Sequence, residues 1–390
     1  MGQRPLGSVA LHPYRSVFAS HRFAIAALML LNVSLLTPSV GSADQQILAI
    51  SGDAQPGGSG AQLAGVGTPT LNNSGQVVLQ ARLTEGVGGV DSQNDAALWF
   101  IDGSARELLA WKGAGDLSNG ASYASFAAAS IADDGDVVFK AATDGGKQGF
   151  WRASRDGGRS TIALSATTGV PGSQLQNAQY QTFGFQLLHA PSDVVAFNSK
   201  MVREVGGVDN SNSRGVWRNN GVATELLVRE LISDVPSLPA AKFLVPSAEG
   251  INIQGQTALL GSLVNGYGDV TTQNALAIWR LGGGGNSDVL IARKSIGEAA
   301  GVAGGLFGGF SDLHINAAGA ISYVGELQLG GDVTAENMRG LWLFDGSDNR
   351  LGYCPTTVLL RFPPLEPLFA RSILGEWMDT KPCASAPLRS

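Results

Sequence analysis

The sequence is poor in charge, histidine and cysteine. Asp, Glu, Lys and Arg make up 15% of its 390 residues, and the formal net charge is −6. We therefore expect no nucleic-acid partner, because such binding needs a basic patch. Only four histidines and two cysteines occur, without Cys-x-x-Cys, His-Glu-x-x-His, Gly-x-Ser-x-Gly or Walker-type motifs. The sequence thus offers no familiar zinc, hydrolase or nucleotide site, and we assign no catalytic residue and no metal ligand.

Long apolar runs are missing beyond the N-terminal region. The run FAIAALMLLNVSLL, residues 23–36, follows three arginines and is too short to span a bilayer comfortably. Gly41 and Ala43 are the small residues that a signal peptidase prefers. These features predict a signal peptide over residues 1–43, with an uncleaved membrane anchor as the alternative. After cleavage we expect no membrane span and a secreted or periplasmic protein.

Both cysteines, Cys354 and Cys383, lie in the C-terminal tail, residues 351–390. In an oxidising compartment they would close a loop of about 29 residues, which the loop-entropy model values at ~3–4 kcal/mol. We therefore expect a disulfide in the tail.

What the sequence has in abundance is glycine, 53 residues of it, and part of this glycine is periodic. One short motif recurs about every 60 residues: an aliphatic residue, often Asn next, then Gly, then alternating apolar residues. Its anchors are Gly75, Gly135, Gly255 and Gly319, and a degenerate copy has Asp193. Asn-x-x-Gly favours a tight turn, since Asn bonds to the local backbone and Gly accepts a positive φ.

A tryptophan follows each copy of this motif. In four of the five copies Gly, Val and Asn precede it by eleven, nine and five positions; the second copy has a shortened loop. The tryptophans are Trp99, Trp151, Trp217, Trp279 and Trp342. A further apolar strand comes next, and aromatic residues at Phe126, Phe183, Phe243 and Phe310 open the following units.

Each unit therefore predicts about four strands, and residues 44–350 predict an all-β repeat domain. The segment 45–58 resembles the strand that follows each tryptophan, so we expect it to complete the last unit and close a ring. The fold we predict is a five-bladed β-propeller of about four strands per blade. An open solenoid and two packed sheets are the alternatives.

The repeats resemble a family of exported bacterial proteins with tandem NxxGxxxF-type repeats and no characterised function. NNSGQVVL, DDGDVVF, NIQGQTAL and NAAGAISY carry the resemblance, with the LW, VW and IW pairs and the GDAQPG linker, over residues 45–346. Such proteins often look anchored through a C-terminal sorting helix. The polar, proline-interrupted tail here favours a released or periplasmic protein instead, and the resemblance implies no catalytic residue.

The repeated loops supply the best candidate ligand-binding residues. Oxygen-bearing side chains recur at the same loop positions: Asp91, Asp209, Asn94, Asn212, Asn274 and Asn337. Clustered oxygens suit calcium. An asparagine that caps its own turn explains the same spacing without a metal, so we expect no cofactor and keep calcium as the alternative.

Three other groups deserve a functional interpretation beside a structural one. His189 and His314 sit near equivalent repeat positions and would face one channel in a ring, although strand-end histidines usually bond to the backbone. An acidic turn holds Asp133, Asp134 and Asp136, whose simplest explanation is solvation rather than glycoside chemistry. Trp111 and Trp377 fall outside the register and are free to stack on a sugar.

Together these features favour a non-catalytic protein that binds or scaffolds an unknown protein or glycan outside the cytoplasm. The alternative is a secreted carbohydrate-active enzyme with its site at a central channel. A purely structural role comes third.

Overall fold

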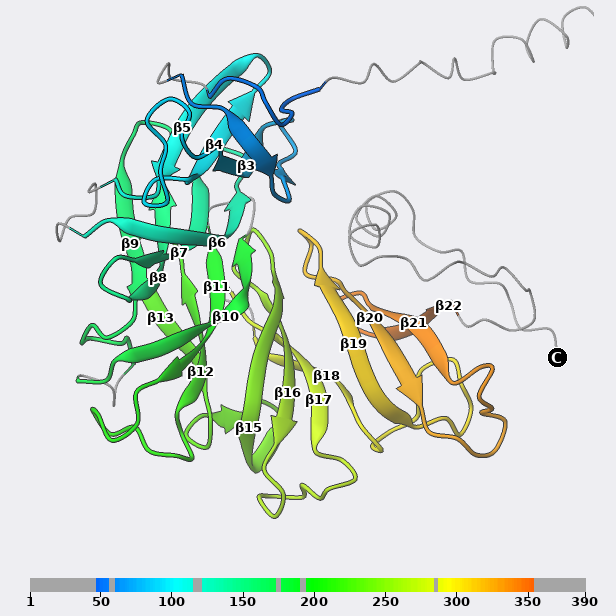
Figure 1. Ribbon diagram of the computed structural model, residues 1–390. Coiled ribbons are helices and arrows are strands. Elements are labelled where there is room, and N and C mark those ends of the chain that lie inside the picture. The colour runs from blue at the N-terminus through cyan, green and yellow to red at the C-terminus, as the bar shows by residue number, and fades with distance from the viewer. Residues whose placement is uncertain are drawn as a thin grey trace, which may run out of the picture. The chain divides into compact units, whose positions relative to one another are not determined.

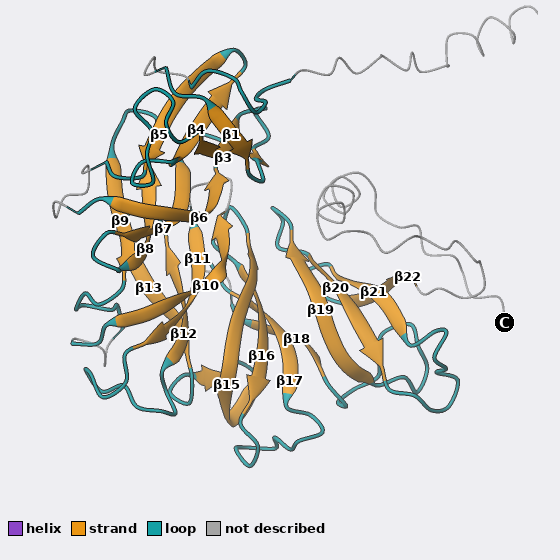
Figure 2. Cartoon of the chain, viewed as in Figure 1, coloured by secondary structure: helices purple, strands orange, loops and turns teal. Residues whose placement is uncertain are grey.

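The computed structural model describes residues 47–55, 60–114, 121–172, 177–189, 194–283 and 287–353. The chain divides into a segment Met1–Leu48 and a unit Ala49–Ser390, which contains every described strand. Figure 2 shows strands and loops and no helix in the described ranges. None of these ranges therefore holds a helix long and apolar enough to cross a membrane. The predicted signal peptide, Cys354 and Cys383 lie outside them.

The described strands form five antiparallel sheets that follow one another along the chain (Figure 1). The first sheet contains β1 (Leu63–Val66), β2 (Thr70–Leu71), β3 (Val77–Leu83), β4 (Ala96–Asp102) and β5 (Ala105–Trp111). The second contains β6 (Tyr123–Ile131), β7 (Val137–Thr143), β8 (Gln148–Ala153) and β9 (Arg159–Leu164). The third contains β10 (Tyr180–His189), β11 (Val195–Met201), β12 (Arg214–Asn219) and β13 (Thr224–Arg229).

The fourth sheet contains β14 (Asp234–Val235), β15 (Leu238–Ile251), β16 (Thr257–Leu263), β17 (Leu276–Leu281) and β18 (Val289–Arg293). The fifth contains β19 (Phe307–Ile315), β20 (Ile321–Leu327), β21 (Arg339–Phe344) and β22 (Asn349–Tyr353). Each sheet has the up-and-down strand order of a propeller blade. The all-β, repeat-built fold predicted from the sequence is confirmed.

The predicted role of the N-terminal segment is wrong. The fifth sheet is completed by its own hairpin, in which Leu351 of β22 lies opposite Trp342 of β21. The N-terminal segment folds back on the first sheet instead, where Gly52 N–H donates to the Leu63 carbonyl and Gln55 N–H to that of Ala61. The last strand of the fifth sheet is thus β22, which follows β21 directly in the chain, and not the N-terminal segment that the sequence pattern predicted.

The Asn-x-x-Gly motif forms the turn between the first two long strands of a repeat, as predicted. At Asn72 the side-chain oxygen accepts hydrogen bonds from the N–H groups of Ser74 and Gln76, at 3.1 and 2.9 Å. Gly75 has φ 78°, a conformation that suits glycine. Asn72 also donates to the carbonyl of Ala132, in the next repeat's turn, at 2.8 Å. The motif therefore shapes its own turn and joins neighbouring sheets.

The five landmark tryptophans are all buried at matched positions in the third long strand of their sheets. Every one has 2% or less of its surface exposed. Trp217 stacks on Phe197 at 6.1 Å and meets Tyr180 edge-on at 5.1 Å, and Trp342 repeats this with Tyr323 and Phe307. The next strand is bulged opposite each tryptophan, which adds one residue to that strand.

One of the aromatic residues that open the repeats, Phe243, is not at the position at which the sequence pattern aligned it. Phe243 lies opposite Leu263 and meets Trp279 edge-on at 5.1 Å. It therefore occupies the place of Tyr180 and Phe307, and is not equivalent to Phe183, which lies three residues further along its strand. The sequence pattern did not separate these two aromatic positions.

Neighbouring sheets share their cores. One cluster joins Val138 and Phe150 of the second sheet to Phe183 and Trp217 of the third, and three further clusters join the other successive sheets. Polar links accompany the packing: Gln80 Nε2 donates to the Phe126 carbonyl at 3.0 Å. At the same place in the next two sheets, Lys140 donates to Phe183 and Asn198 exchanges hydrogen bonds with Ala248.

We predict that Gly325→Ala lowers the free energy of unfolding by about 1–3 kcal/mol through overpacking. A Cβ at this buried position would lie 2.7 Å from both Phe307 and Trp342. Gly309→Ala is the matched control, because its Cβ would meet nothing closer than 3.7 Å. Denaturant unfolding of the full chain measures both, and equal stability of the two variants would contradict this account of the tryptophan site.

Candidate functional site

The candidate loop asparagines share one hydrogen-bonding pattern. In each, Oδ1 accepts the N–H of the residue three positions earlier, and Nδ2 donates to the carbonyl five positions earlier. For Asn94 these partners are Asp91 and Gly89, at 2.7 and 3.1 Å. The asparagines are Asn94, Asn212, Asn274 and Asn337. Each amide thus holds its own loop with both of its polar atoms.

The two loop aspartates also bond within their loops. Asp91 accepts the N–H of Gln93 at 2.8 Å. Asp209 accepts the N–H and the hydroxyl of Ser211, at 2.7 and 2.6 Å, and these hydrogen bonds lower the pKa of Asp209. Both carboxylates therefore act as turn caps of the kind that Asp commonly provides.

A cationic side chain at the end of the outer strand, or directly after it, enters three of these four loops. Arg229, 1% exposed, donates to the carbonyls of Asn212 and Gly207 at 3.0 and 3.1 Å and to Asn212 Oδ1 at 2.9 Å. Arg293, 3% exposed, donates to the Asn274 carbonyl and to both oxygens of Asp269. These guanidinium groups thus hold carbonyl, amide and carboxylate oxygens of the loops.

Lys112 plays the corresponding part in the first sheet. Its ammonium group donates to the Ser92 carbonyl at 2.5 Å and to Asp95 at 2.7 Å. The hydrogen bond from Lys112 lowers the pKa of Asp95, and the hydrogen bond from Arg293 likewise lowers the pKa of Asp269. In these three loops, side chains of the protein itself therefore place a positive charge beside the loop oxygens. Within the described residues no group of three or more His, Cys, Asp or Glu side chains is placed to hold a metal.

The acidic turn of the second sheet is occupied by backbone and neighbouring side chains. Asp133 accepts two hydrogen bonds from Asn73 at 3.0 Å, one from its backbone and one from its side chain. Asp134 accepts the N–H of Asp136 at 3.0 Å, and Asp136 accepts the N–H of Arg155 at 3.3 Å. The three acids therefore cap turns and join two sheets.

Of the two histidines and two tryptophans singled out in the sequence, the side chains of His314 and Trp111 lie within the described residues. His314 is half-buried in β19, opposite Ser322 of β20, while the side chain of His189 lies outside the described part. Trp111 is the half-buried last residue of β5, and Trp377 lies outside the described residues.

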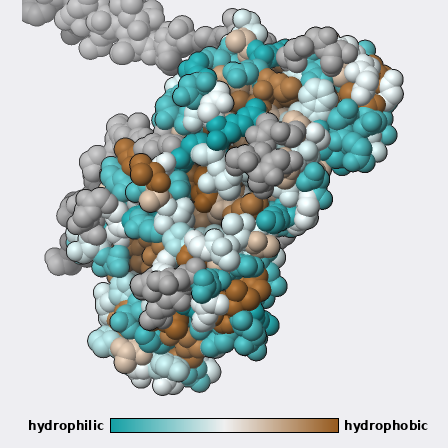
Figure 3. Space-filling view, turned by 90° about the vertical axis from the view of Figure 1, so that its left-hand side faces the viewer, coloured by the Kyte–Doolittle hydropathy of each residue, from teal (hydrophilic) through white to brown (hydrophobic). Residues whose placement is uncertain are grey.

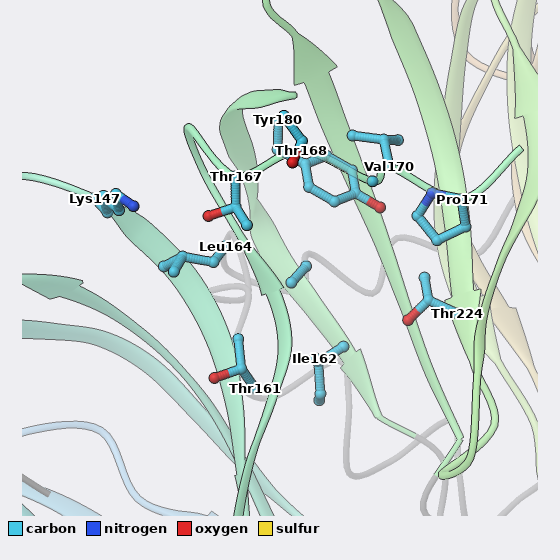
Figure 4. Close-up of a pocket in the computed structure, with 12 residues that line it drawn as sticks. Lys147, Thr161, Ile162, Leu164, Thr167, Thr168, Val170, Pro171, Tyr180 and Thr224 are labelled. Carbon is cyan, nitrogen blue, oxygen red and sulfur yellow. The ribbon is translucent and has the colours of Figure 1, made fainter. Parts of the chain in front are cut away.

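A pocket of about 580 Å³ lies between the second and third sheets (Figure 4). Its polar lining consists of Lys147 and four threonines: Thr161, Thr167, Thr168 and Thr224. The threonines come from β9, from the connection after it and from the start of β13. Ile162, Leu164, Val170 and Pro171 supply apolar wall. The described lining includes no Asp or Glu.

Tyr180 completes one side of this pocket, and its hydroxyl lies beside Val170 and Pro171 (Figure 4). The hydroxyl is buried without a hydrogen-bond partner among the described residues, and burial raises the pKa of Tyr180. Phe243 and Phe307 hold the same place in later sheets, so packing does not require the hydroxyl. Tyr123 shares the unpaired hydroxyl; what distinguishes Tyr180 is its position in the pocket wall.

Sequence reasoning missed the arginines that follow three of the tryptophans. Arg218 donates to the carbonyls of Gly255 and Gly282, and Arg280 donates to that of Gly319 at 3.0 Å. Each thereby reaches the turn of the next sheet. The signal was present as a recurring Trp-Arg pair at 151–152, 217–218 and 279–280. The pocket gave no such signal, because its threonines follow no repeat spacing.

These features define a repeat-built, all-β protein with propeller-like sheets. A model of a family of unknown function, DUF7453, matches residues 30–230, just over half of the 390-residue chain, and the chain belongs to this family. No curated protein matches the sequence.

Several solved structures are similar at low identity. They include the Dos1 propeller, with 10% identity and a TM-score of 0.35 over 75% of this chain and 60% of that one. The polysaccharide lyase Uly1 has 12% identity and a TM-score of 0.35 over 76% and 61%. The α-L-arabinanase of Penicillium chrysogenum has 8% identity and a TM-score of 0.32 over 79% and 86%. The chain thus spans about three fifths of the first two structures.

We predict that Arg229→Met lowers the free energy of unfolding by about 3 kcal/mol, because it leaves buried loop carbonyls without a donor. Arg203→Met, an exposed arginine ahead of the same loop, is the control and should change stability by less than about 0.5 kcal/mol.

The unmodified protein should unfold at the same midpoint with calcium and with a chelator, because the loops are already held by the cationic side chains of the chain. A calcium ion that bound only the folded state would raise the midpoint. A calcium-dependent rise in the midpoint would show that a metal occupies a loop after all.

Proposed function

We propose that the protein is an exported, non-catalytic binding protein, and that the pocket between its second and third sheets holds a ligand rich in hydroxyl groups. The observation that carries the proposal is the pocket lining. Four threonines and one lysine line it together with Tyr180 and with apolar wall from Ile162 and Val170. This mixture of short hydroxyl groups and apolar surface suits a glycan, whose hydroxyls need partners and whose C–H faces need apolar contact.

The same lining supports binding rather than turnover. Most enzymes that hydrolyse glycosidic bonds use two carboxyl groups at the scissile bond, and the described lining includes neither Asp nor Glu. The acidic turn around Asp133 is engaged in hydrogen bonds between repeats. A secreted carbohydrate-active enzyme and a purely structural role are the alternatives that the experiment below distinguishes from binding.

The face of the molecule drawn in Figure 3 also suits an exported binding protein. On the face shown in Figure 3, hydrophobic side chains gather in small separate patches between polar ones. Single exposed apolar residues such as Val222, 93% exposed, are ordinary on such surfaces. Selective recognition would then depend on a concave site rather than on a broad apolar face.

The proposal predicts that a glycan from a panel of neutral oligosaccharides raises the unfolding midpoint of the protein, and that Thr168→Trp abolishes the rise by filling the pocket. Thr168 is exposed at the pocket, so the larger side chain should be tolerated by the fold. Thr272→Trp, in an exposed turn of the fourth sheet, is the control and should retain the rise.

Binding is measured by thermal unfolding and calorimetry, and each bound glycan is then assayed for cleavage over a day. Cleavage would replace the binding proposal by the enzyme alternative. A flat panel, or a midpoint shift that survives Thr168→Trp, would reject this pocket as the glycan site.

Export has its own test. Expression of the full chain in a Gram-negative host should give a periplasmic or released protein whose first residue is Asp44, the residue after the predicted cleavage position. Mass spectrometry of the N-terminal peptide checks this outcome, with Ala43→Arg as the variant that should block processing. A product that keeps residues 1–43 in the membrane fraction would favour the uncleaved anchor.

A further inference from the structure

A second concave site lies between the third and fourth sheets and shares no lining residue with the threonine-lined pocket. It is a groove of about 260 Å³ formed by β10, β11, β12 and the first long strand of the fourth sheet, β15. Its polar groups include Thr182, Lys200, Arg214 and Ser247, and Phe183, Val245 and Pro246 supply apolar wall. None of its described lining residues is acidic.

Two positive charges are aligned in this groove. Lys200 of β11 lies directly opposite Arg214 of β12 on one side and Thr182 of β10 on the other. Side chains directly opposite one another in an antiparallel sheet project from the same face. The ammonium, guanidinium and hydroxyl groups therefore form one row across three strands.

This pair of cations is not required by the fold. The corresponding cross-strand pairs in the other four sheets are Arg82 with Ala96, Ala142 with Gln148, Ser262 with Leu276, and Glu326 with Arg339. Only the third sheet has like charges here, and like charges directly opposite one another destabilise a sheet. The unfavourable pair occurs where the groove lies.

The two charges are also incompletely neutralised. Arg214 contacts Glu230 at 3.4 Å, and the same carboxylate accepts the Arg214 N–H at 3.0 Å. The Arg214 side chain is nevertheless 45% exposed, while that of Glu230 is 5% exposed. The ammonium group of Lys200 makes no hydrogen bond or ion pair with any residue in the described ranges. One net positive charge is left facing the groove.

The other groups of the groove fit a sugar ring that carries this anion. Ser247 Oγ accepts a hydrogen bond from Asn198 at 3.1 Å, which leaves its own proton available for donation. Val245, 40% exposed, and Pro246 offer apolar surface beside the charges. We propose that this groove binds the carboxylate of a uronic-acid unit in an acidic polysaccharide, through Lys200 and Arg214.

Calorimetry of the full chain at low salt, with free-acid oligogalacturonate and its fully methyl-esterified form, tests the proposal. The free acid should bind at least tenfold more tightly than the ester, and its affinity should fall as salt is added. Lys200→Gln should weaken free-acid binding about tenfold. Lys294→Gln, a lysine outside the groove, should leave it unchanged.

Other outcomes would overturn the proposal. These are equal affinity for acid and ester, no free-acid binding at low salt, or binding unaffected by Lys200→Gln. Poly-glutamate that binds as tightly as the oligogalacturonate would show that an acidic peptide is the ligand instead. Thr168→Trp should leave uronate binding intact, so failure at the groove and failure at the pocket are separately visible.

Discussion

The structure depends on one packing requirement, the burial of an indole ring in the third long strand of every sheet. Opposite the ring on the second strand lies an aromatic residue in three sheets, where it stacks on the indole, and a leucine in the other two. In every sheet the fourth strand is bulged opposite the ring. In three sheets its N–H donates to a linker carbonyl: that of Pro171 for Trp217 and of Pro236 for Trp279, both at 3.2 Å, and that of Ala300 for Trp342, at 3.1 Å. One side chain therefore contacts residues of the other strands of its sheet and, in three sheets, of the linker as well.

The sheets are not independent units, because each completes its core with residues of the next. Lys140 and Asn198 reach across to the first strand of the following sheet, and Arg218 and Arg280 reach to its turn. Repeat proteins of this kind gain stability from nearest-neighbour contacts as well as from each repeat. The polar links explain how charge-poor sheets keep a fixed relation to their neighbours along the chain.

The repeat geometry could be read from the sequence because it is local and recurs. Asn72 and Gly75, three positions apart, predict a turn, and the constant spacing of the tryptophans predicts the strand register. The order of strands at the two ends could not be read in this way. The segment 45–58 and the strand Asn349–Tyr353 have similar apolar patterns, and only the hairpin after Phe344 decides which of them pairs with β21.

The candidate sites were less predictable for the same reason. The loop asparagines were found by spacing, but their partners Arg229 and Arg293 lie 17 and 19 residues away, on another strand. The residues of the threonine-lined pocket and of the Lys200–Arg214 row follow no common spacing in the sequence. They come together only through the pairing and packing of strands. Pattern analysis detects what repeats, whereas these sites arise where repeats differ.

The loops that receive Lys112, Arg229 and Arg293 carry a consequence for where the protein can work. A loop that is ordered by a bound ion has a shape that depends on the concentration of that ion. Here the positive groups that contact the loop oxygens are side chains of the same polypeptide, so their effective concentration at the loop does not change on dilution. The conformation of these three loops is thus set by the amino-acid sequence, and it should be the same in calcium-rich and calcium-poor solutions.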